Sequence, residues 1–266
     1  MNTIGDVRDL YIDLLKKALL HSIWYEHERG DSKLMRPLRQ IAPSLFGHPR
    51  GTIAERTEGR VWPEFAHTMI GLPRVNNLQF CVERVLQDNI PGDLIETGVW
   101  RGGACILMRG VLKAYGVTDR IVWAADSFEG LPKPDVEKAP EDRGDKHHTY
   151  PQLSVDIDTV RRNFREYELL DDQVKFLKGW FKDTLPGAPI EQLAVCRLDG
   201  DMYESTMDAL SALYPKLSAG GYLIVDDYGI VPGCRAAVDD YRREFGIVEQ
   251  VEDIDGWGVY WRKINN

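Results

Sequence analysis

Four aspartates stand where two apolar stretches of the sequence end. Asp199 and Asp201 follow the first stretch, and Asp226 and Asp227 close the second, with 27 positions between Asp199 and Asp226 (226 − 199 = 27). One predicted helix separates the stretches, so we expect a right-handed strand–helix–strand crossover that brings both carboxyl ends to one sheet edge. Like charges so close together require a compensating cation, and carboxylate oxygens suit a hard divalent ion such as Mg²⁺. Helix capping and solvated loops are the alternative interpretation.

A glycine-rich segment could hold a ligand beside these acids. Residues 96–103 read ETGVWRGG and begin at the end of a predicted strand. Gly98 allows a tight turn, and Gly102 and Gly103 let a ligand and a helix approach the backbone closely. The carboxylate of Glu96 would repel a pyrophosphate but can accept hydrogen bonds from an ammonium group or from hydroxyls. The segment therefore favours a cationic ligand that bears an amino acid, and a tight turn without a ligand is the alternative.

Two further positions could complete a nucleoside site. Asp126 ends the next predicted strand, 28 positions after Gly98 (126 − 98 = 28), where an acid can bind both hydroxyls of a ribose. Gly179 and Trp180 end the following strand, and an indole there can stack on a flat base such as adenine. A capping role for Asp126 and packing of Trp180 between helix and sheet are the alternatives.

The elements that must position these residues alternate along the chain. Apolar runs, the predicted strands, are followed in turn by helical patterns: strands at 93–97, 121–125, 174–179, 193–199 and 222–227, and helices at 102–115, 156–168, 203–214 and 233–245. Continuous apolar strands between helices predict a parallel sheet with helices on both faces. Two last runs, 247–252 and 257–262, flank Asp255-Gly256, a turn signal that predicts an antiparallel hairpin. The predicted fold is therefore α/β, mostly parallel with a C-terminal antiparallel pair.

Other segments extend this pattern. Apolar positions at steps of three and four predict helices over 6–23 and 74–89. Residues 28–62 contain Pro and Gly interruptions that indicate a mobile surface segment or a short helical excursion. Residues 131–155 lack periodicity and follow a strand end, where open α/β sheets hold their ligands, so we expect a lid rather than a disordered insertion.

Composition narrows the class of protein. The 266 residues include 42 acidic and 33 basic side chains, a formal net charge of −9, which argues against nucleic acid or anionic lipid as a partner. No run approaches the roughly 20 apolar residues of a membrane span, and charged residues interrupt the first apolar stretch, so we expect a cytoplasmic protein. The four cysteines lack CxxC spacing, and the six histidines add no zinc pattern, which is typical of buried structural thiols.

The combined motifs resemble the class I S-adenosylmethionine-dependent methyltransferases, and more closely the macrocin O-methyltransferase family, which includes the mycinamicin and novobiocin tailoring enzymes. The matching segments are AHTMIG (66–71), PGDLIETGVWRGGACI (91–106), ADSFEG (125–130), LLDDQVKFLKGWFKDTLP (169–186), RLDGDMY (197–203) and GGYLIVDDY (220–228). The resemblance implies a Rossmann-like methyltransferase domain at 91–266, preceded by a helical extension and substrate-pocket segment at 1–90.

The resemblance also implies roles for single residues. Glu96, Gly98 and Arg101 would line the methionine part of S-adenosylmethionine, with Thr68 and Met69 closing over it. Asp126 would hold the ribose, with Ser127, Phe128 and Trp180 near the adenine, and Thr97, Gly102 and Gly179 complete the predicted cofactor-binding set. Asp199, Asp226 and Asp227 would bind Mg²⁺, and Asp201 would act as the general base.

The implied activity is methylation of a sugar hydroxyl on a glycosylated natural product, a tailoring step in antibiotic biosynthesis. Membership of this family also implies a homodimer or a higher homo-oligomer. Two alternatives stay open from the sequence. Asp199-Gly200-Asp201 has the DxD form of a metal-dependent glycosyltransferase, although Glu96 disfavours the pyrophosphate site that such an enzyme needs. A protein that binds the cofactor without catalysis is the second alternative.

Overall fold

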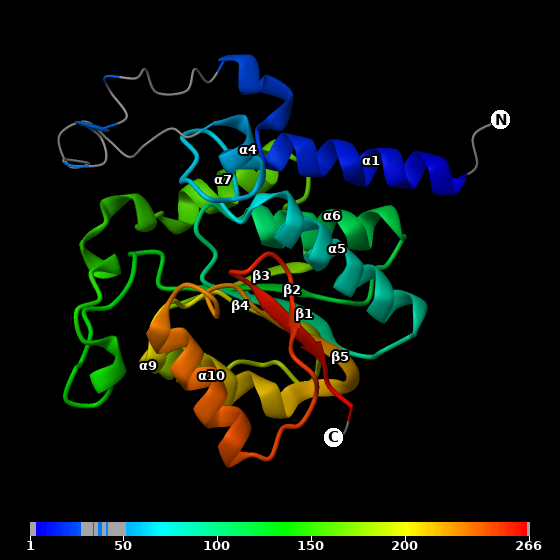
Figure 1. Cartoon of the computed structure of the whole chain (residues 1–266). Coiled ribbons are helices and arrows are strands. Elements are labelled where there is room, and N and C mark those ends of the chain that lie inside the picture. Colours follow the sequence, from blue (N-terminus) through cyan, green and yellow to red (C-terminus); the bar gives the residue numbers. More distant parts are fainter. Residues whose placement is uncertain (1–3, 28–33, 35–36, 39–40, 42–51, 265–266) are drawn as a thin grey trace.

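A seven-stranded sheet in the order β3-β2-β1-β4-β5-β7-β6 forms the centre of the computed structural model, which describes residues 4–27, 34, 37–38, 41 and 52–264 (Figure 1). The strands are β1 (Asp93–Thr97), β2 (Val122–Asp126), β3 (Val174–Lys178), β4 (Leu193–Leu198), β5 (Leu217–Val225), β6 (Glu252–Asp253) and β7 (Val259–Arg262). Strands β1 to β5 pair in parallel, and β7 runs antiparallel to β5 and β6. The predicted mostly parallel α/β sheet with a C-terminal antiparallel pair is confirmed.

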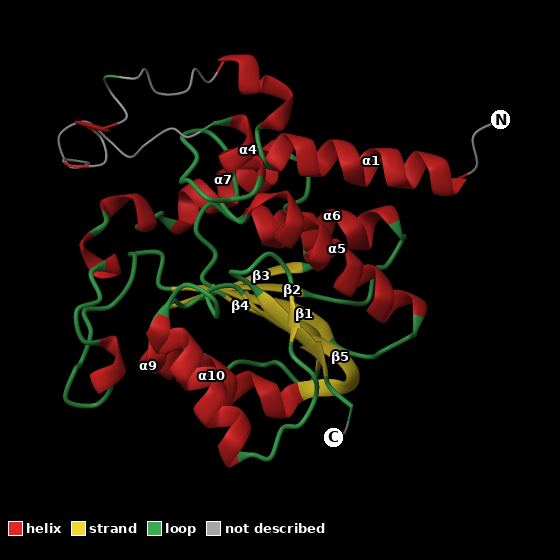
Figure 2. Cartoon of the chain, viewed as in Figure 1, coloured by secondary structure: helices red, strands yellow, loops and turns green. Residues whose placement is uncertain are grey.

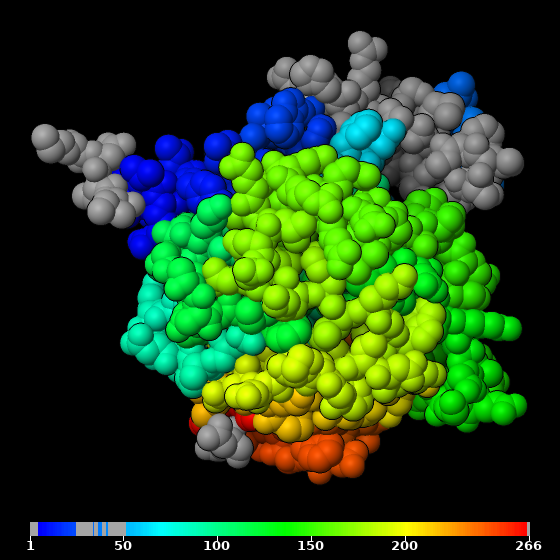
Figure 3. All heavy atoms as spheres, turned by 180° about the vertical axis from the view of Figure 1, so that it is seen from behind, coloured from blue at the N-terminus to red at the C-terminus, as the bar shows by residue number. Residues whose placement is uncertain are grey.

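Helices cover both faces of this sheet, as Figure 2 shows in red against yellow. One face carries α1 (Ile4–Leu19), α5 (Gly71–Gln87), α6 (Gly103–Ala114) and α7 (Ile157–Glu166), and the other carries α8 (Phe181–Thr184), α9 (Tyr203–Leu213) and α10 (Pro232–Glu244). The view from behind agrees, with α1 in blue and α10 in orange at opposite ends of the molecule (Figure 3). The short helix α4 (Ile53–Thr57) precedes α5.

The alternation of side chains along each strand builds two cores, one on each face. On β1, Leu94 packs into the core beneath α5 and α6, whereas the next residue, Ile95, packs into the core with α9 and α10, and both side chains are fully buried. Successive residues of a strand point to opposite faces, so a strand covered on both sides is mostly apolar, with charged residues such as Glu96 and Arg197 where they have buried partners. This explains why the central strands read as continuous apolar runs.

Several segment predictions need correction. The first helix ends at Leu19 instead of 23, because His21 adopts a left-handed φ of 55° that stops the α-helix. The first strand of the C-terminal hairpin covers only Glu252–Asp253, not 247–252. Of the 28–62 segment, residues 28–33, 35–36, 39–40 and 42–51 lie outside the described residues. Its described part contains the predicted short helical excursion as α4, which starts with a capping box between Thr52 and Glu55.

Residues 131–155 form an ordered wall with three 3₁₀ turns, Pro140–Asp142, His147–Thr149 and Pro151–Leu153. The expectation of a lid here stays a prediction. All four cysteines are free and buried, as predicted. Among the helices that the structure describes, none combines the length and apolar composition that crossing a bilayer requires. The predicted homodimer and cytoplasmic location stay predictions.

Candidate functional site

The strand order brings the predicted site together. β1, β4 and β5 are neighbours, and backbone bonds continue past the strand ends: the N–H of Asp199 donates to the carbonyl of Thr97, and that of Asp226 to Leu198, both at 2.9 Å. These ends open into a cavity of about 420 Å³. The predicted residues that line the cavity are Thr68, Met69, Glu96, Gly98, Asp126, Ser127, Trp180, Asp199, Asp201, Asp226 and Asp227.

The three predicted metal ligands lie within reach of one ion. One carboxylate oxygen from each of Asp199, Asp226 and Asp227 lies within 4.8 Å of the others. Asp226 and Asp227 are buried, and Asp199 is partly buried. Three hard oxygen donors converging from two strand ends, with the cavity open beside them, fit a divalent cation that keeps part of its water shell.

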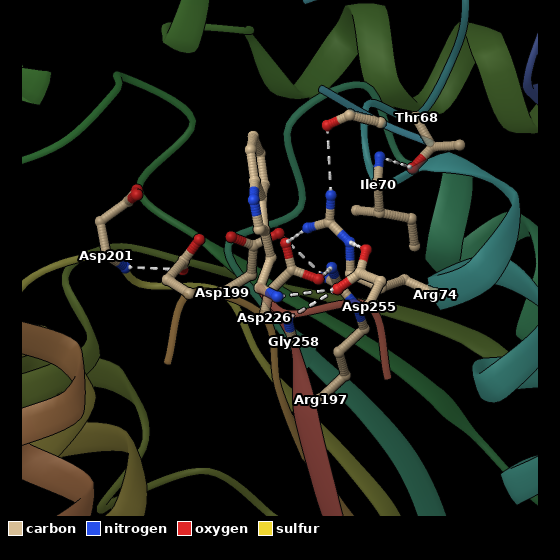
Figure 4. Close-up of polar contacts among 12 residues, drawn as sticks. Thr68, Ile70, Arg74, Arg197, Asp199, Asp201, Asp226, Asp255 and Gly258 are labelled. Atoms are coloured by element: carbon tan, nitrogen blue, oxygen red, sulfur yellow. Dashed lines mark hydrogen bonds and ion pairs between the residues drawn. The ribbon is translucent and has the colours of Figure 1, made fainter. Parts of the chain in front are cut away.

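A buried arginine that the sequence analysis did not identify holds this acidic group. Arg197 on β4 is 1% exposed, and its guanidinium donates to Glu96 at 2.5 Å, to Asp199 at 2.9 Å and to Asp226. Figure 4 shows Arg197 together with Asp199 and Asp226. Burial alone would lower the pKa of Arg197, but Asp226, Asp199 and Glu96 together raise it well above the usual value. Arg197 therefore stays charged and links the glycine-rich end of the cavity to the proposed metal site.

A second buried arginine enters the group from α5. The guanidinium of Arg74 donates to the second oxygen of Asp226, to Asp255 at 3.1 Å and to the carbonyl of Gly59 at 3.3 Å. Asp255 belongs to the β6–β7 loop, so Arg74 fastens the N-terminal part of the chain and the C-terminal hairpin to the same carboxylate (Figure 4). From the sequence alone, Asp255 was predicted only as part of a turn.

The site has more carboxyl groups than guanidinium groups to bind them. Two guanidinium groups, those of Arg74 and Arg197, face six carboxyl groups: Glu96, Asp199, Asp201, Asp226, Asp227 and Asp255. Burial raises the pKa of Asp227 well above its usual value, and the charges of Asp201 and Asp199 raise it further. Burial and Asp226 likewise raise the pKa of Asp199. Carboxylates in this state gain from a further cation, which is the electrostatic argument for a divalent ion here.

Glu96 and the glycine-rich segment form the other end of the cavity. Burial raises the pKa of Glu96 to about 7, against the lowering effect of Arg197. Its second oxygen accepts a hydrogen bond from the Cys105 thiol at 3.0 Å. The ammonium group of a bound ligand would therefore share the Glu96 oxygens with Arg197 and Cys105. Gly98 has a φ of 84°, and a Cβ there would lie 1.7 Å from the carbonyl oxygen of Asp199. Only glycine fits this turn, which keeps the two strand ends in contact.

Asp126 lies in the cavity wall, but its oxygens hold the neighbouring turns. The carboxylate accepts backbone N–H bonds from Val99 at 2.6 Å, Trp100 at 3.4 Å and Phe128 at 2.7 Å. Burial raises its pKa, and these bonds act in the opposite direction. A ribose hydroxyl would bind the same carboxylate that accepts N–H bonds from the loop after β1. Asp126 would therefore contact both this loop and the proposed ligand.

Five residues of the predicted cofactor set lie outside the cavity lining. Thr97 is fully buried, Gly102 precedes α6 with a φ of 91°, and the N–H of Gly179 donates to the carbonyl of Asp126 at 2.9 Å. Phe128 packs in the core, 6.1 Å from the ring of Phe176. Arg101 donates to the carbonyls of Glu64 and Ala66, both at 2.9 Å. Their direct contact with a cofactor stays a prediction.

Asp201 stands at one side of the arginine-bound group, with its carboxylate directed away from Arg197 (Figure 4). It has a left-handed φ of 56°, and burial, followed by the charge of Asp199, raises its pKa to about 7. The ring of His147 lies 4.0 Å from Asp201. His147 was not predicted from the sequence, because it lies in a segment without periodicity.

Part of the cavity lining is aromatic, and these residues were not predicted either. Trp62 and Trp257 line the cavity, and the guanidinium of Arg60 lies 4.8 Å from the centre of the Trp257 indole. Trp62 contacts the ring of Tyr150 edge-on, with centroids 5.5 Å apart. The cavity therefore combines acidic residues at the strand ends with aromatic residues from segments distant in sequence.

Comparison with known proteins gives a consistent result. The family model described as Macrocin-O-methyltransferase (TylF) matches residues 8–263. The chain is 51% identical over 257 residues to demethyldecarbamoylnovobiocin O-methyltransferase of Streptomyces niveus, covering 96% of this chain and 93% of the relative. It is 50% identical over 260 residues to mycinamicin III 3''-O-methyltransferase of Micromonospora griseorubida, covering 96% of both chains.

Solved structures agree with this similarity. The structure of the O-methyltransferase NovP matches with a TM-score of 0.87 at 50% identity, over 97% of this chain and 100% of that chain. The calicheamicin methyltransferase CalS11 matches with a TM-score of 0.59 at 17% identity, over 89% of this chain and 95% of that chain, which shows a shared fold. The predicted class I methyltransferase architecture is confirmed.

Proposed function

The chain belongs to the macrocin O-methyltransferase family, and from this premise we propose that it methylates a sugar hydroxyl of a glycosylated natural product, as a tailoring step in antibiotic biosynthesis. S-adenosylmethionine is the proposed methyl donor and Mg²⁺ the proposed metal. The observation that carries the proposal is the position of Asp199, Asp226 and Asp227 within 4.8 Å of one another in the same cavity as Glu96.

The residues present fit both groups. The cavity of about 420 Å³ is large enough for a ligand of this class, and its excess of carboxylates suits a cationic donor and a divalent ion. When bound, S-adenosylmethionine supplies an electrophilic methyl group, and Mg²⁺ supplies a Lewis acid that polarises an acceptor hydroxyl. Glu96 and Asp126 would hold the donor, and the three aspartates would hold the metal.

The chain's own residues would perform the remaining work. A sugar hydroxyl is a weak nucleophile until its proton has an acceptor, and a carboxylate oxygen of Asp201 faces the cavity to take that proton. Its pKa of about 7 is close to the pH of the cell, which favours a general base. Arg197 and Arg74 orient Asp226 by binding both of its oxygens, so the ligand set is fixed before a metal arrives.

The two alternatives from the sequence are set aside. Relatives that match nearly the whole chain are named as O-methyltransferases. This argues against a glycosyltransferase that would use Asp199-Gly200-Asp201. It also argues against a protein that binds the cofactor without catalysis. The names of the relatives suggest the acceptor class, since one of them is a 4'-O-methyltransferase for a rhamnosyl-tetracenomycin from Streptomyces olivaceus, 53% identical over 97% of this chain and 94% of the relative.

A product assay tests the proposal. The protein is incubated with S-adenosylmethionine and, separately, with demethyldecarbamoylnovobiocin, mycinamicin III and the rhamnosyl-tetracenomycin, before and after removal of metal with a chelator. We expect a product heavier by one methylene group from at least one glycoside, lost in chelator and restored by Mg²⁺. Full turnover in the chelator would remove the metal from the mechanism, and methylation of an aglycone alone would refute a sugar acceptor.

A further inference from the structure

We propose that His147 is a positioning residue for Asp201: held by Asp145, its ring sets the direction in which the Asp201 carboxylate faces the acceptor. The inference rests on the proposed role of Asp201 as the base and adds a residue to that same site. His147 belongs to the 131–155 segment, which connects β2 to α7, and lines the cavity opposite the end of β4.

Asp145 fixes the ring of His147 twice. One carboxylate oxygen accepts the backbone N–H of His147 at 2.8 Å, and the other lies 2.6 Å from ring atom Nδ1. A carboxylate only accepts hydrogen bonds, so Nδ1 carries the proton in this pair. The second ring atom, Nε2, then faces Asp201, with Oδ1 at 4.0 Å, and it carries a proton to donate when the ring is an imidazolium. Burial lowers the pKa of His147, but the charges of Asp201 and Asp145 raise it above the usual value, which favours this form. This separation exceeds a hydrogen bond, and such contacts commonly shorten when the substrate binds.

The segment that carries His147 is itself anchored to the helix that follows Asp201. Asp142 is 3% exposed, and its carboxylate accepts the backbone N–H groups of Tyr203 at 2.6 Å and Glu204 at 3.2 Å. These are the first residues of α9, which has no cap from its own N-cap side chain. Asp142 thus supplies the missing cap from a distant segment and fixes the distance between that segment and Asp201.

Two more contacts hold the segment after His147. The indole N–H of Trp100 donates to the carbonyl of Gln152 at 2.9 Å, and the ring of Tyr150 contacts Trp62. Gly233 on α10 leaves room for the Asp142 carboxylate, because a Cβ at this position would lie 2.5 Å from one of its oxygens. His147 is therefore held from both sides, as a residue that orients a catalytic group must be.

Asp201 needs such a partner. Its left-handed backbone turns the side chain away from Arg197 and toward the 131–155 segment, and its own N–H is 3.3 Å from Asp227. Neither Asp145 nor His147 is a proposed metal ligand, so the pair can act on the base without occupying the metal site. Displacement of a reacting group by about 1 Å can reduce a rate by about 100-fold, which sets the scale of the effect.

Steady-state kinetics of three variants test the proposal. We expect His147→Ala to lower kcat about 10- to 100-fold, with the acceptor KM and the affinity for S-adenosylhomocysteine changed less than about threefold. His147→Gln should recover part of the loss, because its amide can still donate toward Asp201. Lys146→Ala, an exposed residue of the same turn, is the matched control and should behave as the wild type. An unchanged kcat in His147→Ala, or an equal loss in the control, would overturn the proposal.

A double variant separates this role from a merely structural one. In an Asp201→Asn background, His147→Ala should cause no further loss of kcat, because the residue acts through Asp201. Independent, additive losses would overturn the proposal. If the wild type methylates none of the acceptors, the proposed function fails, but crystal structures of the wild type and His147→Ala still test the positioning role. We expect the Asp201 carboxylate to move in His147→Ala. An unmoved carboxylate would refute the positioning role.

Discussion

Replacing Arg197 by methionine should destabilise the protein more than any surface charge change. Arg197 is 1% exposed and binds Glu96, Asp199 and Asp226. Methionine has a similar length and no charge, so the buried carboxyl groups of Glu96 and Asp226 and the partly buried one of Asp199 would lose their shared partner. Removing one member of a buried ionic group typically costs about 3–5 kcal/mol, a large part of the roughly 5–15 kcal/mol that stabilises a protein domain.

The loss of unfolding free energy in Arg197→Met should become larger as the pH rises. In the native protein, burial raises the pKa of Glu96 to about 7 although Arg197 lowers it, so without Arg197 this pKa rises further. The unfolded chain loses its Glu proton near pH 4.3, while the folded variant retains it until its raised pKa. The unfolded state therefore binds fewer protons between these values, and the stability of the variant falls as the pH rises.

Urea unfolding at pH 5.5 and pH 8 measures this effect directly. We expect a deficit of about 3–5 kcal/mol at pH 8 and a smaller one at pH 5.5, with partial recovery in the double variant that also carries Glu96→Gln. The control is Arg84→Met, which removes an exposed helical pair with Asp88 and should cost less than about 0.5 kcal/mol. A deficit below about 1 kcal/mol, or one that grows toward acid pH, would refute the reasoning.

Three more predictions concern the cavity wall. Asp126→Ala should raise the KM for S-adenosylmethionine about 10-fold or more, because the variant loses a proposed ribose acceptor and the order of the loop after β1; an unchanged KM would exclude that role. Gly98→Ala should abolish binding of S-adenosylhomocysteine in calorimetry, since its Cβ would overlap the carbonyl of Asp199; retained affinity would show that the turn can relax. Asp142→Ala should lower the free energy of unfolding by about 1 kcal/mol through loss of the α9 cap, and an unchanged urea midpoint would contradict this.

The sheet was predictable because burial on both faces leaves a direct trace in the sequence. The bounds of β1 were predicted to the residue, since Asp93–Thr97, with Leu94 and Ile95 at its centre, lies between a Pro-Gly pair and a glycine-rich turn. The first strand of the hairpin was not, because its length depends on tertiary contacts. Glu252 and Asp253 pair with β7, and Asp255, just beyond them, is held by Arg74 on α5.

The acidic half of the site was predictable for a similar reason. Asp199, Asp226 and Asp227 follow strands, and parallel strands meet at one edge. The basic residues of the site could not be predicted. Arg197 is the one charged residue of strand β4, and its three partners lie on or just after three different strands. Arg74 lies in a helix whose spacing indicated only an amphipathic surface. Their roles depend on which side chains meet in space, and no local pattern encodes that meeting.

His147 was beyond prediction for another reason. Its segment is fixed by Asp142, Trp100 and Tyr150 through contacts with α9, the loop after β1 and the N-terminal part of the chain. None of these contacts is periodic, so the sequence indicated a lid and gave no position for the ring.

The most direct measurement is a crystal structure of the protein soaked with Mn²⁺ in place of Mg²⁺ and recorded for anomalous scattering. We expect one strong peak at a coordination distance of roughly 2.0–2.6 Å from an oxygen of each of Asp199, Asp226 and Asp227. This peak should disappear in Asp227→Asn while S-adenosylhomocysteine still binds. A peak elsewhere, or no peak in crystals of an enzyme that methylates its acceptor in chelator, would contradict the central claim.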